Sequence, residues 1–362
     1  MTQSIKRRVL LVDDAVVVRK VLSQAIGADP DLEVAATAAN GRIALEKFAP
    51  AKPDIVLLDI EMPEMDGLET VRELRKINGR VPIIMFSTLT ERGATVTLEA
   101  LALGATDYVT KPSNINGAAT LEAISGELIP KIRALCHLRA SPGSPIPEAK
   151  QLRPQLSIPP HPPLLPPAHV VVIGVSTGGP DALARVLPSL PADFPVPLLI
   201  AQHMPPIFTS MLAARLTSKC VLPVRECVSG EPLKPGCALI APGDFHMVVQ
   251  SEDGVAYVRT NQGPRENFCR PSVDVLFRSV ANVYGARTLA VILTGMGQDG
   301  LSGCEMLRSQ GARVYVQDEA SSVVWGMPGF VARSGFADKI LPLHQIGAEI
   351  VRATTLQTAA RV

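Results

Sequence analysis

Acidic side chains end two apolar runs in the first third of the chain. Asp13 and Asp14 follow residues 9–12, and Asp59 follows residues 55–58. Three carboxylates that meet in space repel one another unless a hard cation joins them, and Mg²⁺ with oxygen ligands suits that need. Asp59 can then attack a phosphoryl donor and form an aspartyl phosphate. These residue types therefore predict magnesium-assisted phosphoryl transfer to Asp59.

Two further polar side chains end apolar runs in the same part of the chain. Ser87 follows residues 83–86, and Lys111 follows the run from Tyr108 to Thr110. We expect the Lys111 ammonium group to neutralise charge on the transferring phosphoryl group and the Ser87 hydroxyl to donate to a phosphate oxygen. Each aspartate alone could be a helix cap or a turn acid, but that alternative weakens when all five positions are filled together.

A second set of reactive side chains lies in the other half of the chain. Residues 174–178 fit the G-x-S-x-G pattern, a turn that exposes a serine between a strand and a helix, with Ser176 at its centre. His203 and Asp299 each follow a later apolar run. A serine nucleophile, a histidine that removes its proton and a carboxylate that orients the imidazole form the triad of a hydrolase. Glycines around Asp299 would also let backbone N–H groups approach an oxyanion.

Each member of this second set has a plainer alternative. A turn of small residues at Ser176 could bind phosphate, although neither G-x-G-x-x-G nor a P-loop lysine is present. His246 rivals His203, and Asp299 could cap the helix after it. His203 is favoured because it follows the next strand after that of Ser176, so both side chains reach one sheet edge. The order serine, histidine, aspartate disfavours the α/β-hydrolase fold, in which the acid precedes the histidine.

The elements that must position the first set alternate regularly. The expected strands are 8–13, 32–37, 54–59, 81–86 and 106–110, and the expected helices begin near Val16, Gly41, Gly67, Arg92 and Ala118. This α/β alternation predicts a parallel sheet with helices on both faces and the flavodoxin-like strand order 2-1-3-4-5. The loops after such strands lie at one edge, so Asp13, Asp59 and Lys111 should meet there.

A change of composition divides the chain into parts. Ten prolines fall between residues 137 and 167, without any amphipathic period, which predicts an extended linker. We therefore expect a phosphoryl-accepting domain at 1–136, this linker, and a catalytic domain at 168–357. The second domain is predicted to be doubly wound and mainly parallel α/β, with an inserted antiparallel hairpin formed by 247–250 and 255–260.

Composition argues against several classes of protein. Thirty-five Lys+Arg against 34 Asp+Glu give a formal net charge of +1, so nothing favours a nucleic-acid partner. The first apolar run is too short for a signal peptide, and no apolar stretch approaches the ~20 residues of a membrane span. The six cysteines form no C-x-x-C pair, which predicts free thiols rather than a disulfide or zinc framework. We expect a cytoplasmic protein without direct membrane insertion.

The first ~130 residues resemble the response-regulator receiver family. The resemblance rests on five filled positions, Asp13, Asp14, Asp59, Ser87 and Lys111. It implies that Asp59 accepts phosphate from a histidine kinase and that Asp13 and Asp14 hold Mg²⁺ with it. It also implies that Tyr108 reports the switch; the plainer alternative is a half-buried strand residue, since tyrosine favours strands.

Both halves together resemble the CheB family, the chemotaxis response regulators that act as protein-glutamate methylesterases. The matching segments are Gly-x-Ser-Thr-Gly-Gly at 174–179, Gln-His-Met at 202–204 and Thr-Gly-Met-Gly-x-Asp-Gly at 294–300. The resemblance implies Ser176 as nucleophile, His203 as general base and acid, and Asp299 as the orienting acid. It further implies Thr177 and the Met296 backbone N–H near the oxyanion, and no cofactor for the ester chemistry.

The same resemblance implies a substrate, and the covalent pairing of the two domains suggests a control mechanism. The chain would hydrolyse γ-glutamyl methyl esters on the cytoplasmic part of methylated chemoreceptors, releasing methanol, and would also deamidate receptor glutamines. We expect the unphosphorylated receiver to cover the Ser176 edge and phosphorylation of Asp59 to open it. Two alternatives are a receiver that drives transcription and an idle nucleotide-binding or scaffold module. Residues 270–274 and 325–328 also match the family, but a capped helix start and a turn account for them.

Overall fold

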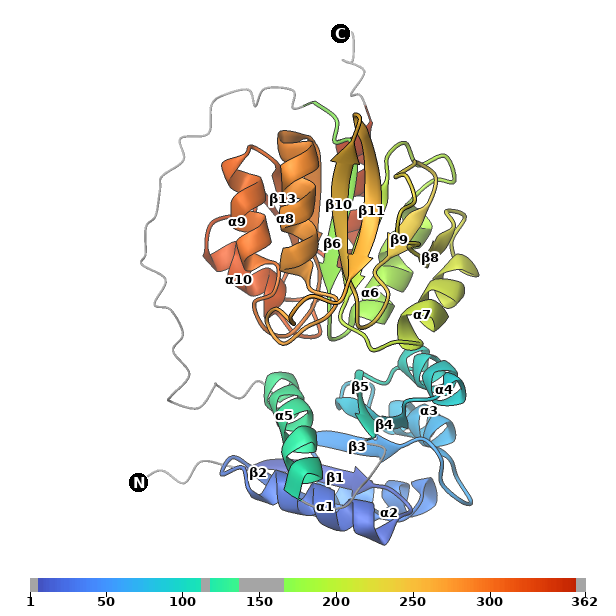
Figure 1. Ribbon diagram of the computed structural model, residues 1–362. Coiled ribbons are helices and arrows are strands. Elements are labelled where there is room, and N and C mark those ends of the chain that lie inside the picture. Colours follow the sequence, from blue (N-terminus) through green and yellow to red (C-terminus); the bar gives the residue numbers. More distant parts are fainter. Residues whose placement is uncertain (1–5, 112–117, 137–165, 356–362) are drawn as a thin grey trace, which may run out of the picture. The chain divides into compact units, whose positions relative to one another are not determined.

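The computed structural model describes residues 6–111, 118–136 and 166–355 (Figure 1). These residues form two compact units, one before residue 143 and one after it. Most of the predicted proline-rich linker, residues 137–165, lies outside the described residues.

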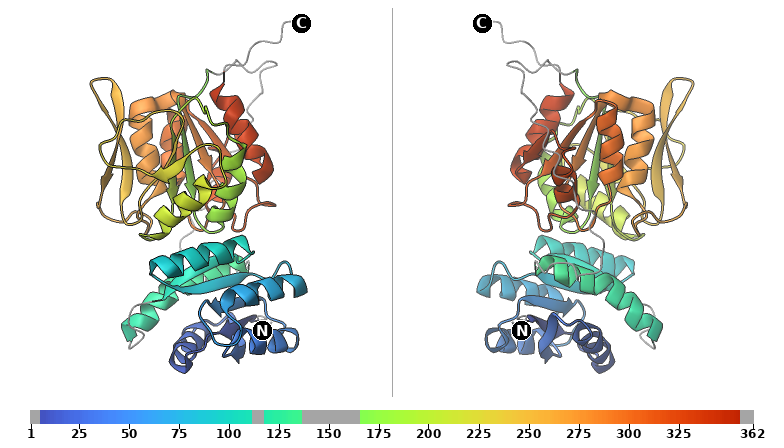
Figure 2. Two further views of the ribbon diagram at one scale, coloured as in Figure 1. Left: turned by 90° about the vertical axis from the view of Figure 1, so that its right-hand side faces the viewer. Right: turned by 90° about the vertical axis from the view of Figure 1, so that its left-hand side faces the viewer.

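The first unit is a five-stranded parallel sheet between helices. Its strands are β1 (Arg7–Val12), β2 (Leu32–Ala38), β3 (Ile55–Asp59), β4 (Ile83–Thr88) and β5 (Asp107–Lys111). Its helices are α1 (Val16–Gly27), α2 (Gly41–Ala51), α3 (Gly67–Ile77), α4 (Glu91–Ala102) and α5 (Ala118–Leu135). The strand order is β2-β1-β3-β4-β5, so the predicted flavodoxin-like topology is confirmed. Helices α1 and α5 contact each other on one face, and α2, α3 and α4 form a row on the other (Figures 1 and 2).

Strands β1 and β3 lie inside this sheet and consist of continuous apolar runs. Residues 9–12 and 55–58 are all buried, as expected for parallel strands that helices cover on both faces. A polar side chain is tolerated only where such a run ends, and Asp59 occupies that position in β3. The sequence therefore places its acidic residues at the carboxyl edge of the sheet.

The second unit is built on a seven-stranded parallel sheet. Its strands are β6 (Val170–Val175), β7 (Leu198–Gln202), β8 (Val224–Glu226), β9 (Ala238–Ile240), β12 (Thr288–Ile292), β13 (Arg313–Gln317) and β14 (Lys339–Leu341). Its α-helices are α6 (Gly179–Val186), α7 (Phe208–Thr217), α8 (Val273–Tyr284), α9 (Leu301–Ser309), α10 (Met327–Arg333) and α11 (Leu343–Thr354). The order β14-β13-β12-β6-β7-β9-β8 puts β6 between β12 and β7. The residues that follow these three strands consequently share one sheet edge.

An antiparallel hairpin completes the second unit. Strands β10 (His246–Glu252) and β11 (Val255–Asn261) pair with each other, which confirms the predicted hairpin. They form a sheet of their own instead of extending the large one. The hairpin packs on α8, where Val249 N donates to Ser279 Oγ at 3.0 Å and Met247 shares a buried cluster with Phe277. Its role is to support α8 and the loop that leads into it.

All six cysteines are free, as predicted. Within the described ranges, no helix combines the length and the apolar character that crossing a membrane requires.

Candidate functional site

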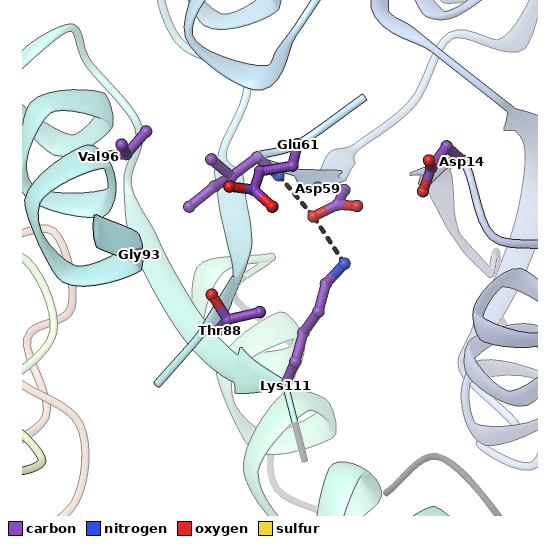
Figure 3. A pocket seen from close by; sticks show the side chains of 8 residues that line it. Asp14, Asp59, Glu61, Thr88, Gly93, Val96 and Lys111 are labelled. Carbon is purple, nitrogen blue, oxygen red and sulfur yellow. Dashed lines mark hydrogen bonds and ion pairs between the residues drawn. The ribbon is translucent and has the colours of Figure 1, made fainter. Parts of the chain in front are cut away.

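The first candidate site lies at the carboxyl edge of the five-stranded sheet (Figure 3). Asp59 ends β3, Lys111 ends β5, and Asp13 directly follows β1. Lys111 Nζ lies 2.7 Å from Asp59 Oδ1 and 3.1 Å from Asp13 Oδ2. The fold thus joins three side chains that are far apart in the sequence, as the expected sheet topology requires.

Asp14 completes a set of three carboxylates at this edge. One oxygen each from Asp13, Asp14 and Asp59 lies within 4.8 Å of the other two, and Asp14 is exposed whereas the other two are buried. Asp14, Asp59 and Lys111 line a pocket of about 230 Å³ (Figure 3). Closely spaced carboxylate oxygens that face an open pocket fit a small hard cation such as Mg²⁺.

The Asp59 carboxylate has few partners for a buried charge. Burial raises its pKa to about 6, and the nearby Asp13 adds to that increase, although Lys111 counteracts both. The Ile60 backbone N–H donates one hydrogen bond at 2.7 Å. A second cation would therefore stabilise the charged form of Asp59, which is the form that can act as a nucleophile.

The two remaining residues expected in the switch pack away from this pocket. Ser87 Oγ accepts a hydrogen bond from Thr97 Oγ1 at 2.7 Å and lies 3.3 Å from the Gly93 carbonyl oxygen, and Thr88 lines the pocket instead. Tyr108 is buried in β5, and burial raises the pKa of its hydroxyl well above the usual value. Its ring centroid lies 5.1 Å from Lys131 Nζ.

The second candidate site lies at the carboxyl edge of the seven-stranded sheet. Ser176 directly follows β6, and His203 directly follows β7. The last residues of these strands, Val175 and Gln202, are paired in register, and His203 N donates to Val175 O at 3.1 Å. Ser176 and His203 therefore leave adjacent strands at the same level of the sheet.

A turn of small residues carries Ser176. Gly178 has a φ of 77°, which favours glycine, at the start of α6. A second glycine allows a close approach from the loop after β12, because a Cβ added at Gly295 would lie 2.8 Å from Ser176 Cβ. This approach packs the backbone before Met296 against the serine, while Thr177 is buried next to it.

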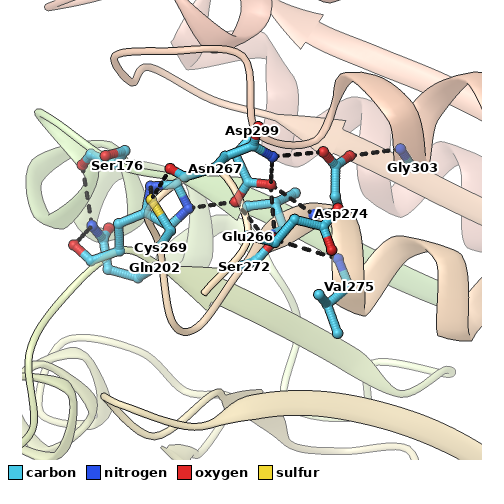
Figure 4. A network of polar contacts seen from close by, with 12 residues as sticks. Ser176, Gln202, Glu266, Asn267, Cys269, Ser272, Asp274, Val275, Asp299 and Gly303 are labelled. Carbon is cyan, nitrogen blue, oxygen red and sulfur yellow. Dashed lines mark hydrogen bonds and ion pairs between the residues drawn. The ribbon is translucent and has the colours of Figure 1, made fainter. Parts of the chain in front are cut away.

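Asp299 is bound by the amino-terminal end of α8 (Figure 4). The backbone N–H of Val273 donates to Asp299 Oδ2 at 2.7 Å, and that of Asp274 donates to Oδ1 at 3.1 Å. Ser272 Oγ and Asn267 Nδ2 donate to Oδ1 at 2.9 and 3.0 Å. Free N–H groups and the dipole at a helix amino terminus favour an anion, so this carboxylate is held in one orientation.

Capping of the following helix does not explain Asp299. Helix α9 has Gly300 at its N-cap position and no side-chain cap. Ser272, in contrast, caps α8 by accepting from Val275 N at 3.4 Å while it donates to Asp299. Residues 270–274 therefore form the capped helix start that was expected of them, and the same segment also positions Asp299.

His203 forms an ion pair with Asp299. Nε2 lies 2.8 Å from Asp299 Oδ2, and since a carboxylate only accepts, Nε2 carries the hydrogen. Burial alone would lower the pKa of His203, but hydrogen bonds to Asp299 and Cys269 raise it to about 10. Burial likewise opposes the charge of Asp299, yet the contact with His203 and the α8 N–H groups holds its pKa well below the usual range.

The other ring nitrogen of His203 faces a cysteine. Cys269 Sγ lies 3.5 Å from Nδ1, and among the described residues no hydrogen bond joins His203 to Ser176. Sequence reasoning missed Cys269 and Asn267, because both lie in the aperiodic loop between β11 and α8. Their position just before residues 270–274, which match the family pattern, was the available signal.

His246, the rival histidine, has a structural role. It is buried at the start of β10, its Nε2 donates to Pro264 O at 2.9 Å, and its Nδ1 accepts from Ser272 N at 3.2 Å. Both nitrogens are thus used to hold the loop that precedes α8.

Comparisons with known proteins cover both units. A model of the CheB methylesterase family matches residues 171–350, and one of the response regulator receiver domain matches residues 9–121. A protein-glutamate methylesterase/protein-glutamine glutaminase from Trichodesmium erythraeum (strain IMS101) is 47% identical, covering 96% of this chain and 99% of its own. One of the same description from Nocardioides sp. (strain ATCC BAA-499 / JS614) is 48% identical, covering 98% and 97%.

A solved structure agrees with these matches. The catalytic domain of the CheB methylesterase from Thermotoga maritima superposes with a TM-score of 0.50 at 42% identity, and covers 51% of this chain and 98% of its own. The relatives match along nearly the whole chain, both units included. The chain therefore belongs to the CheB family of protein-glutamate methylesterases, response regulators in which a receiver domain is joined to a methylesterase domain.

Proposed function

We propose that this chain hydrolyses glutamate γ-methyl esters on the cytoplasmic part of chemoreceptors and also deamidates receptor glutamines. Both activities stand in the names of the relatives from Trichodesmium erythraeum and Nocardioides. The observation that carries the proposal is the 2.8 Å contact between His203 and Asp299 at the sheet edge that also bears Ser176. The substrate and a histidine kinase as phosphodonor both require that the protein act in the cytoplasm.

Ser176 is the nucleophile in this mechanism. Its hydroxyl attacks the ester carbonyl, its proton passes to His203 Nδ1, and the same proton leaves with methanol as the acyl-enzyme forms. Water then attacks the acyl-enzyme with His203 again as base, which releases glutamate and restores Ser176. Nδ1 is the proton acceptor because Nε2 keeps its hydrogen in the bond to Asp299.

Thr177 and the backbone N–H of Met296 stabilise the developing oxyanion. Supporting this role, Thr177 directly follows the nucleophile, and the 295–296 backbone passes against Ser176 through the close approach of Gly295. Fixed donors aimed at an oxyanion typically contribute about 10²- to 10³-fold in rate each. No cofactor is needed for these steps.

Asp59 accepts the phosphoryl group in the first unit. Asp13, Asp14 and Asp59 would hold Mg²⁺, which when bound neutralises negative charge on the phosphoryl group and on the carboxylates. Lys111 adds a positive charge 2.7 Å from the Asp59 carboxylate. The Ser87 hydroxyl then moves from its contact with α4 toward the phosphate, and Tyr108 responds to that rearrangement.

Phosphorylation controls the hydrolase through the receiver. The unphosphorylated receiver restricts access to Ser176, and phosphorylated Asp59 releases that restriction. A difference of about 1–3 kcal/mol between the two arrangements changes activity by roughly 5- to 150-fold. The domains that carry this control are receiver 1–136, linker 137–167 and methylesterase 168–357.

Methanol release from methylated receptor membranes tests the proposal. The wild-type chain, Ser176→Ala and Asp59→Ala are compared with and without a small phosphodonor plus Mg²⁺. We expect release that requires Ser176 and a stimulation by phosphodonor that requires Asp59. Absence of release while Asp59 is stoichiometrically phosphorylated would reject the methylesterase function for this chain.

A further inference from the structure

Cys269 is held firmly beside the catalytic histidine. It closes a tight turn in which Glu266 N donates to Cys269 O at 3.1 Å and Cys269 N donates to Glu266 O at 2.9 Å. Asn267 and Phe268, the central residues of the turn, have φ values of 51° and 64°. Two ion-paired hydrogen bonds of 2.6 Å from Arg278 to Glu266 fix one end of the turn.

The turn is also tied to the acid of the site. Asn267 Nδ2 donates to Asp274 Oδ2 at 2.9 Å and to Asp299 Oδ1 at 3.0 Å (Figure 4). The sulfur of Cys269 is therefore positioned by the same network that orients His203. Cys269 is only half-buried.

The distance between sulfur and nitrogen matches a metal-ligand pair. Zn–S and Zn–N bonds of about 2.3 and 2.0–2.1 Å at a tetrahedral angle put the two ligand atoms about 3.5 Å apart. Cys269 Sγ and His203 Nδ1 are 3.5 Å apart. One ligand atom from Asp299 also lies within 4.8 Å of these two residues' ligand atoms.

Asp299 supplies the support that a zinc-binding histidine needs. Metal-bound histidines generally donate their second N–H to a carboxylate, which fixes the ring and raises its basicity. His203 Nε2 makes that bond to Asp299 at 2.8 Å, which leaves Nδ1 for a ligand. Thiolate and imidazole together select soft or borderline cations over Mg²⁺, which prefers the carboxylates of the first unit.

We propose that His203 Nδ1 and Cys269 Sγ bind Zn²⁺, with water completing its coordination, and that the bound ion inhibits the hydrolase. Binding displaces into solvent the thiol proton and the proton that Nδ1 carries in the protonated imidazole, and the ion then occupies the lone pair on Nδ1. Inhibition rests on the proposed function, because that lone pair is the one that accepts the Ser176 proton. Binding of the ion does not depend on the reaction.

Binding is measured on the full chain carrying Ser176→Ala, with excess Mg²⁺ to occupy the carboxylates of the first unit. Zn²⁺ is titrated against a chromophoric chelator, and Co²⁺ is used to detect the thiolate-to-metal absorption band. Cys269→Ser is expected to weaken Zn²⁺ binding at least about tenfold and to abolish the band. The control Cys237→Ser, at another half-buried thiol, keeps both. Equal affinity and an unchanged band in Cys269→Ser would overturn the proposal.

Inhibition is measured as methanol release relative to each variant's own zinc-free rate. The Ser176-containing chain should lose activity as Zn²⁺ occupies the site and regain it with a chelator, whereas Cys269→Ser should resist the same concentrations. Full occupancy without inhibition would overturn the inhibitory role. If the chain releases no methanol even without zinc, the proposed function fails and the inhibitory role falls with it, while the binding data still decide the metal site.

Discussion

Asp59 and Asp299 are both buried carboxylates at the carboxyl edge of a parallel sheet, yet their surroundings differ sharply. Among the described residues, Asp299 accepts hydrogen bonds from His203, from two N–H groups of α8 and from the two side chains Ser272 and Asn267. Asp59 has the Ile60 N–H and the Lys111 ammonium group. Accordingly the pKa of Asp299 is well below its usual range, whereas burial raises that of Asp59 to about 6.

The difference is the one expected between an orienting acid and a reacting one. A carboxylate with every lone pair occupied is fixed in position and has nothing left for a nucleophilic attack. A carboxylate with few donors pays a desolvation cost that a cation or a covalent bond relieves. The first arrangement suits the support of His203, and the second suits binding of Mg²⁺ and acceptance of a phosphoryl group.

The largest expected effect comes from a substitution at Asp299, the carboxylate that is fixed in position. Asp299→Asn keeps the shape of the side chain but cannot stabilise the imidazolium or hold its tautomer, so kcat for methanol release should fall by about 10⁴-fold. Asp274→Asn is a matched control, because Asp274 belongs to the same network through Asn267 but does not contact His203. Comparable losses in the two folded variants would mean that Asp299 acts only through the stability of the loop.

Sequence reasoning predicted the parts of both sites that lie directly at strand ends. In the first unit, continuous apolar runs followed by Asp59 or Lys111 define the strands, so the sheet order and its polar edge followed together. The position of His203 next to Ser176 was predictable for the same reason. Their catalytic roles stay predictions.

The rest depends on contacts that carry no local pattern. Strands β8, β9 and β14 have three residues each, too few for a periodic signal, and the order of the large sheet was not predicted. Cys269 lies on a loop whose place is set by tertiary hydrogen bonds. Asp299 could be expected to cap α9, but the amino terminus of α8, a helix that precedes it in the sequence, binds it instead.

A second test concerns the pH dependence that follows from the contacts of His203. Only neutral His203 can accept the serine proton. Its pKa is raised to about 10, so at pH 7 the His203 side chain is protonated in most enzyme molecules. The value of kcat/KM should therefore rise nearly tenfold per pH unit from 7 to 9. The rate of Ser176→Ala is subtracted to remove alkaline hydrolysis, and a chelator is present throughout.

Cys269→Ala sharpens this test. Removing the sulfur takes away one of the contacts that raise the pKa of His203, so the profile should move to lower pH and activity at pH 7 should increase. A wild-type profile that is already level above pH 7 would show that the neighbouring groups do not hold the proton on His203 in solution.

The next effect concerns Asp59, the carboxylate with few hydrogen-bond donors. Asp59→Asn should keep the basal rate of methanol release, because Asp59 belongs to the first unit, but should lose the phosphodonor stimulation of roughly 5- to 150-fold. A chain without residues 1–150, checked for folding by circular dichroism, should be more active than the unphosphorylated full chain. Equal or lower activity of that folded fragment would reject restriction of access by the receiver.

The smallest effect concerns stability. The folded pKa of Asp59, about 6, lies above the ordinary value of 3.8, so the fold favours the neutral acid and the charge is unfavourable at pH 7. A pKa increase of this size corresponds to at most roughly 3 kcal/mol of unfolding free energy. Loss of the Lys111 contact when Asn replaces Asp offsets part of that gain. Without Mg²⁺, Asp59→Asn should raise the free energy of unfolding of the first unit by about 1–2 kcal/mol at pH 7.

The pH dependence gives the sign of this effect independently. Wild type should gain stability as the pH falls from 7 toward 4, because the folded state takes up its proton before the unfolded state does, and Asp59→Asn should lack that gain. Hydrogen exchange of the β3 amides between pH 5 and 7 measures the free energy of unfolding of the wild type and of Asp59→Asn. Asp14→Asn, at an exposed carboxylate, serves as the control and should change stability by less than about 0.5 kcal/mol. A wild-type first unit that loses stability over the same range would mean that Asp59 is as well stabilised as Asp299, and the contrast between the two sites would disappear.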